Sequence, residues 1–196
     1  ITLNATILKQ TFLYLLIGFF TLPMLAQNDT IWYDENWVIA KKNEAHYFRP
    51  GPQKIKQGFL FVDYYKNGKI QMKGMSLSDK EEIYHGTILW YFQNGNVFQI
   101  VNYDEGVLNG MRSVYFESGS LKSIRYYKSG VLEGPWEHYF QSGGIKEKGY
   151  YSGGEKHGIW DYYDKSGFLV QRGEFESGEK TGTWEEFHPE TEMLNN

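Results

Sequence analysis

The sequence of 196 residues contains no cysteine. That absence excludes disulfide cross-links, cysteine nucleophiles, thiolate metal sites and a lipidated N-terminal cysteine. Proline is scarce, with 5 residues, and neither sign of charge dominates, because the formal net charge is only −4. A protein that binds nucleic acid usually carries a basic stripe, and this chain has none. We therefore expect no nucleic-acid partner.

Aromatic residues and glycine are abundant instead. Aromatic residues make up 18% of the chain, and there are 22 glycines. Aromatic side chains favour half-buried pleated surfaces, and glycine supplies the positive φ that tight turns require. The composition therefore predicts strands and short turns, with almost no helix.

Residues 1–26 differ from the rest of the chain. Lys9 is their single charged residue, an apolar run covers residues 11–20, and the small residue Ala26 ends the segment. This pattern is typical of a secretory signal peptide. The alternative is an uncleaved membrane anchor, but the run is shorter than the roughly 20 apolar residues that a span needs. We expect a cleaved leader and a protein exported to the periplasm, the outer membrane or the exterior.

An internal repeat organises the remaining chain. Three series of glycines recur every 24 residues, and such self-similarity marks a repeat protein. The series are Gly86, Gly110, Gly134, Gly158 and Gly182; Gly95, Gly119, Gly143 and Gly167; and Gly106, Gly130, Gly154 and Gly178. Aromatic series keep the same register: Tyr91, Tyr115, Tyr139 and Tyr163; Trp136, Trp160 and Trp184.

Each unit contains two strand-like runs, each ended by a turn dipeptide such as Asn94-Gly95 or Glu105-Gly106. Short glycine-containing connections between such runs indicate hairpins. The predicted fold is therefore all-β: an elongated, single-layer, twisted antiparallel meander of tandem hairpin repeats. We place the glycines at the hairpins, and we expect Gly149 and Gly173 to leave room for neighbouring tryptophan rings.

The chain then divides into consecutive segments. A capping segment (27–57) precedes the repeat domain (58–188), and a polar tail (189–196) follows it. The capping segment is expected to hold two short strands that cover the open edge of the sheet. Within the repeat domain we assign a looser unit at 58–85 with a longer loop near residues 77–82, regular units at 86–109, 110–133, 134–157 and 158–181, and a partial unit at 182–188.

Three segments carry a family resemblance. GPWEHYFQSG at 134–143 and GIWDYYDKSG at 158–167 resemble the bacterial variant of the MORN (membrane occupation and recognition nexus) repeat. DYYKNGKIQMKG at 63–74 is similar to the opening repeat of exported proteins of Bacteroidetes-type bacteria. Chains of this kind are often labelled antitoxins of the YwqK-like family. The resemblance implies a β-sheet scaffold for protein or membrane association, without catalytic residues or a cofactor.

Candidate binding residues follow from the alternation of strand side chains between two faces. Ile88, Arg112, Trp136, Trp160 and Trp184 share one face in successive units, and the tyrosine series lies on the other. Most aromatics in repeat phase are expected to hold the fold together. The functional alternative is an exposed strip that stacks on sugars, peptides or lipid headgroups, for which the candidates are Arg112, Trp136, His138, Trp160, Tyr162 and Trp184. Arg112, Arg125 and His138 break the repeat phase.

Catalytic patterns are missing from the sequence. The histidines are scattered at unrelated spacings, so no metal site is predicted: His46, His85, His138, His157 and His188. A single-layer sheet also offers no deep cleft for paired carboxylates. We expect a non-catalytic scaffold at the cell envelope that binds a protein partner. The alternatives are binding of carbohydrate, cell envelope or lipid headgroups through the aromatic ladders, and neutralisation of a toxin.

Overall fold

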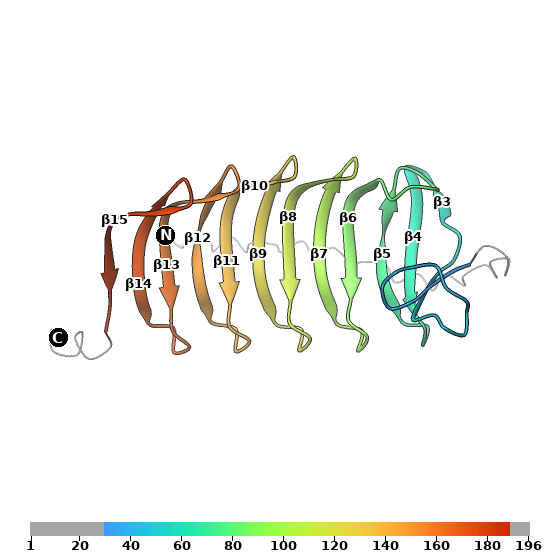
Figure 1. Cartoon of the computed structure of the whole chain (residues 1–196), viewed down its shortest axis with the longest axis horizontal. Helices are drawn as coiled ribbons and strands as arrows, with labels where there is room; N and C mark the ends of the chain where they lie inside the picture. The colour runs from blue at the N-terminus through green and yellow to red at the C-terminus, as the bar shows by residue number, and fades with distance from the viewer. Residues whose placement is uncertain (1–29, 189–196) are drawn as a thin grey trace, which may run out of the picture.

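The computed structural model describes residues 30–188, and all regular structure in that range is β-strand. One 15-stranded sheet runs almost entirely in sequence order, with every pairing antiparallel. Figure 1 shows the strands side by side along the long axis of the molecule, joined by alternating turns. The predicted fold class is confirmed. The predicted signal peptide (1–26) and tail (189–196) lie outside the described residues.

Eleven strands form the repeated part of the sheet. In order they are β4 (Gly58–Tyr65), β5 (Ile70–Ser76), β6 (Tyr84–Tyr91), β7 (Val97–Asp104), β8 (Val107–Tyr115), β9 (Leu121–Lys128), β11 (Gly134–Tyr139), β12 (Ile145–Ser152), β13 (Glu155–Tyr163), β14 (Leu169–Glu176) and β15 (Glu179–Glu186). The short β10 (Val131–Leu132) extends the pairing of β9.

Two kinds of hairpin alternate along the sheet. At one end, two-residue turns require positive φ at both positions: Glu105 has a φ of 47° and Gly106 a φ of 83°. This is the turn whose twist matches that of the flanking strands. At the other end the loops are one residue longer. Phe92 N–H donates to Asn96 O, and Gly95, with a φ of 97°, donates back to Phe92 O.

The glycine series that begins at Gly86 does not lie at hairpins, which corrects the sequence prediction. Gly86, Gly110, Gly134, Gly158 and Gly182 lie in strands with positive φ. At Gly158 the pairing jumps from Lys148↔Asp161 to Tyr150↔His157. Residues 158–160 therefore bulge opposite Gly149. A bulge needs a residue that accepts positive φ, and it increases the local twist of the sheet.

The N-terminal edge carries three short strands: β1 (Ile31–Tyr33), β2 (Tyr47–Arg49) and β3 (Gln53–Ile55). β1 pairs with β2, and both β2 and β3 pair with β4. The sequence suggested two strands here and gave no sign of β3. Aromatic contacts hold this edge, including stacked rings of Phe48 and Tyr64 with centroids 5.0 Å apart.

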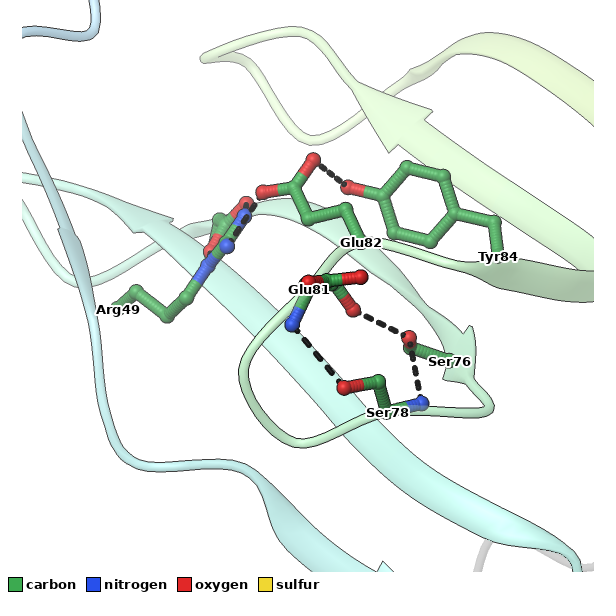
Figure 2. A network of polar contacts seen from close by, with 7 residues as sticks. Arg49, Ser76, Ser78, Glu81, Glu82 and Tyr84 are labelled. Atoms are coloured by element: carbon green, nitrogen blue, oxygen red, sulfur yellow. Dashed lines mark hydrogen bonds and ion pairs between the residues drawn. The ribbon is translucent and has the colours of Figure 1, made fainter. Parts of the chain in front are cut away.

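A buried ion pair joins this edge to the first repeats. Arg49 on β2, with 8% of its surface exposed, donates two hydrogen bonds to Asp63 on β4, at 2.5 and 2.7 Å. A third, at 2.5 Å, reaches Glu82 in the loop between β5 and β6. Figure 2 shows Glu82 between Arg49 and the Tyr84 hydroxyl. The extra residues of this loop therefore deliver a carboxylate to the N-terminal edge.

The sheet has two faces, which we name by their side chains. The tryptophan face carries one row of residues across the strands: Phe61, Gly74, Ile88, Val101, Arg112, Arg125, Trp136, Gly149, Trp160, Gly173 and Trp184. The tyrosine face carries the next row: Val62, Lys73, Leu89, Ile100, Ser113, Ile124, Glu137, Lys148, Asp161, Arg172 and Glu185. Burial is concentrated on the tryptophan face, where Phe61, Met72 and Ile88 form a core cluster.

Candidate interaction surface

Trp160 was one of the candidate binding residues, and the structure buries it completely, at 0% exposure. Its ring lies over the bare backbone of Gly149, where a Cβ would come within 2.3 Å of the indole. The indole N–H donates to Tyr150 O at 3.2 Å, and Lys156 Nζ lies 3.7 Å from the ring centroid. Trp160 therefore holds the sheet together and offers no face to a ligand.

Trp136 and Trp184 are half-buried, and each carries a cation over its ring. Arg125 Cζ lies 4.5 Å from the Trp136 centroid, and Lys180 Nζ lies 3.8 Å from that of Trp184. Cation–π contacts of this kind stabilise the ring and occupy the surface on which a sugar would stack. The predicted aromatic ladder exists, but cations cover much of it.

Tyr162 and His138 are engaged with neighbours on the same face. Lys156 Nζ donates to the Tyr162 hydroxyl at 3.0 Å. Burial, assisted by the Glu147 carboxylate, raises the pKa of Tyr162 to about 12, so this phenol stays neutral at physiological pH. His138 Nδ1 lies 3.2 Å from Glu147 Oε1.

Arg112 occupies the tryptophan position of its repeat. Its Nε and Nη2 donate to Gln99 Oε1 at 3.2 and 2.8 Å. The structure thus places all six predicted residues on one face, as the alternation indicated, but spreads them from β8 to β15 without a common pocket.

The tyrosine face carries a charge row in its C-terminal half. Residues directly opposite one another alternate in sign from β11 to β15: Glu137, Lys148, Asp161, Arg172 and Glu185. Asp161 is 4% exposed and accepts two hydrogen bonds from Arg172, at 2.6 and 2.9 Å. These bonds from Arg172 hold the pKa of Asp161 below its usual value.

Next to this charge row lies an apolar strip, which we define as Tyr126, Pro135, Tyr150 and Ile159. Tyr126, Tyr150 and Ile159 are 37%, 42% and 55% exposed. Tyr150 is directly opposite Pro135, and both line a depression of about 340 Å³ together with Ile159. Contiguous exposed apolar side chains bordered by charges are typical of interaction sites.

This strip was not predicted from the sequence, although one signal was present. Tyr126 and Tyr150 stand where the outer repeats have Asn102 and Glu174. Apolar residues that replace polar ones at a solvent-facing repeat position indicate a local surface function.

The polar cluster at the N-terminal edge lines a second depression of about 340 Å³. Burial alone would raise the pKa of Glu82, but hydrogen bonds from Tyr84 and Arg49 outweigh it and lower that pKa. Burial and the bond to Glu82 raise the pKa of the Tyr84 hydroxyl. The charged groups of this cluster satisfy one another, which indicates attachment of the edge strands.

Residues 30–188 show neither a metal site nor a membrane-spanning helix. No group of three or more His, Cys, Asp or Glu side chains in that range is arranged to hold a metal ion. The same range has no helix with the length and apolar character of a membrane span.

Comparison with protein families agrees with the repeat geometry. Three consecutive segments match the MORN repeat variant: residues 84–105, 108–129 and 132–152. The first two coincide with the hairpins β6–β7 and β8–β9, and the third covers β10 to β12. The chain therefore carries MORN-type repeats, a repeat scaffold suited to binding. No curated protein matches the chain.

Proposed function

We propose that the protein is an exported, non-catalytic MORN-type scaffold that binds a protein partner at the cell envelope through the apolar strip of its tyrosine face. The main supporting observation is the exposure of Tyr126 on β9, Tyr150 on β12 and Ile159 on β13, the last two of which line a shallow depression. Export is inferred from the leader-like composition of residues 1–26.

The strip suits a protein partner with an apolar patch on its own surface. The neighbouring charges Lys148, Asp161 and Arg172 are already paired with one another. They therefore form a polar rim, while the apolar side chains form the centre that a partner would bury. Interfaces of this anatomy concentrate their binding energy in a few central aromatic and apolar side chains.

The test uses the full chain in the cell that makes it, with a photo-cross-linking residue in place of Tyr150. We expect one stoichiometric protein to be cross-linked. Ile159→Glu should weaken binding of that protein about tenfold or more, because central apolar contacts contribute at least ~1–2 kcal/mol. Binding is measured by titration of the purified pair.

The matched control is Val107→Glu. Val107 is 46% exposed, but it is the first residue of β8 and lies outside the strip. Unfolding curves of both variants verify that they are folded. Absence of any cross-linked protein, or equal weakening by the control, would refute the proposal.

Two alternatives are separated by Ile159→Glu together with one further variant, Trp184→Ala. Retention on cell-wall glycan or lipid vesicles that survives Ile159→Glu and is lost on Trp184→Ala would favour binding through the aromatic ladder. A cross-linked partner that is an enzyme and loses its activity on binding would favour a toxin-neutralising role. Turnover of a hydrolase substrate by the purified chain would contradict the non-catalytic part.

A further inference from the structure

Two arginines face each other at the middle of the tryptophan face. Arg112 on β8 and Arg125 on β9 are directly opposite in register. Cα atoms of such pairs lie about 4.5–5.5 Å apart. Like charges in this position destabilise a sheet. All other residues in this row of the tryptophan face, which runs from Phe61 to Trp184, are uncharged.

Neither arginine is neutralised by a carboxylate in the described part of the chain. In contrast, Arg49, Lys148 and Arg172 each form an ion pair with a carboxylate. Glu147, a carboxylate on the same face, is engaged by His138 at 3.2 Å and by Lys156 at 3.9 Å. The arginine pair is thus an uncompensated concentration of positive charge in a chain whose net charge is −4.

Both guanidinium groups are held in place by uncharged neighbours. Gln99 Oε1 accepts two bonds from Arg112, and the Trp136 ring lies under Arg125. Arg125 Nε is buried without a hydrogen-bond partner. Ser123, two positions earlier on the same face and 2% exposed, also has a buried hydroxyl without a partner. Buried donors that lack an acceptor cost free energy, so this part of the face is not fully satisfied by its own neighbours.

We propose that Arg112 and Arg125 together bind one oxyanion, a carboxylate or phosphate group of a ligand. The planar guanidinium fork matches the oxygens of both groups. Arg112 reaches toward Gln99 on β7 and Arg125 lies over Trp136 on β11, so the proposed anion lies between the two side chains. Binding relieves the repulsion between the two arginines. This site lies on the face opposite the apolar strip, so it is independent of the proposed partner interface.

The test follows thermal unfolding and calorimetric titration of the full chain with sodium phosphate, sodium acetate and sodium chloride at equal ionic strength. Phosphate or acetate should raise Tm along a single-site saturation curve that chloride does not reproduce. A response to phosphate alone identifies phosphate groups as the ligand chemistry, and a response to acetate as well identifies carboxylates. Arg112→Gln and Arg125→Gln should each weaken binding about tenfold or more.

Two further variants control the result. Lys128→Gln removes one positive charge from the same strand β9 on the tyrosine face and should leave the anion response unchanged. Arg112→Glu replaces the like-charge pair by an opposite-charge pair, so it should raise Tm without added anion and abolish the response. Equal effects of phosphate, acetate and chloride, or an unchanged response in Arg112→Glu, would overturn the proposal.

Discussion

The two halves of the sheet share a backbone plan but differ in the side chains of the same row. On the tyrosine face, β6 to β9 contribute Leu89, Ile100, Ser113 and Ile124. β11 to β15 contribute the alternating charges Glu137, Lys148, Asp161, Arg172 and Glu185. The other face changes in parallel, from aliphatic Ile88 and Val101 to tryptophan over glycine. The repeat therefore keeps the turns and the strand register constant, while the side chains of the row differ in chemistry between the two halves.

The difference has a physical basis in cross-strand contacts. Directly opposite side chains are close enough for either apolar contact or ion pairing, each about 0.2–1 kcal/mol per pair. An aliphatic row is insensitive to pH and salt. A row of alternating charges depends on both, and it also disfavours a shifted register that would bring like charges together.

The largest expected effect comes from filling the space under a tryptophan ring. Gly149→Ala would place a Cβ 2.3 Å from the rigid Trp160 indole, so we expect a loss of about 3 kcal/mol in the free energy of unfolding. Gly74→Ala, in the other half, meets the more adaptable Ile88 side chain and should cost less. Chemical denaturation measures both.

Gly144→Ala is the control for this pair, because nothing lies within 4 Å of a Cβ at that position. Its unfolding free energy should stay close to that of the parent chain. Equal costs at Gly149 and Gly74 would contradict the contrast between a rigid aromatic half and an adaptable aliphatic half.

A smaller effect is expected from breaking the charge row at its buried member. Asp161→Asn removes the acceptor charge for Arg172 and Lys148, and should cost about 1–2 kcal/mol, since hydrogen bonds to charged groups contribute about that much. Hydrogen exchange should increase in β13 and β14 and stay unchanged in β6 and β7. A uniform increase along the sheet would show that the halves are not energetically distinct.

The smallest effect is a pH dependence confined to the charged half. Because the pKa of Asp161 is lowered in the folded state, its stabilising contribution is present above its unfolded pKa of about 4. That contribution is lost as the pH falls through the lower folded value. Amide hydrogen exchange in β13 and β14, corrected for the intrinsic rate, should therefore become faster as the pH is lowered from 5 to 3. The row of β6 to β9 should show no such change, because it contains no titrating group: Leu89, Ile100, Ser113 and Ile124.

In Asp161→Asn this acid-dependent change should disappear from β13 and β14. If the variant keeps the full change, another carboxylate is responsible and the assignment to Asp161 is wrong.

Local features of the fold were predictable from the sequence because local chemistry decides them. Turns such as Glu105-Gly106 need positive φ at both residues, and the repeated glycines indicate where these turns lie. The close approach of Trp160 to Gly149 was also predicted and is confirmed. Gly158 was wrongly placed at a hairpin and lies in a bulge, because a need for positive φ does not distinguish a turn from a bulge.

The interaction surface was less predictable, because exposure depends on how neighbouring strands align. Trp160 and Trp184 occupy the same repeat position, yet Trp160 is fully buried and the half-buried Trp184 lies on the last strand of the sheet. Arg49, Asp63 and Glu82 come from three separate segments, and no local pattern relates them.

The sequence by itself determined the 24-residue period, the hairpins and the face to which each side chain points. These follow from glycine conformations and from the two-residue alternation of a strand, both of which are local properties. Only the tertiary structure decided which aromatics are covered, that Arg112 and Arg125 meet without a counter-ion, and that Tyr150 and Ile159 share an exposed depression. Those outcomes depend on which side chains of neighbouring strands lie opposite one another, and this is set by contacts between strands rather than within one.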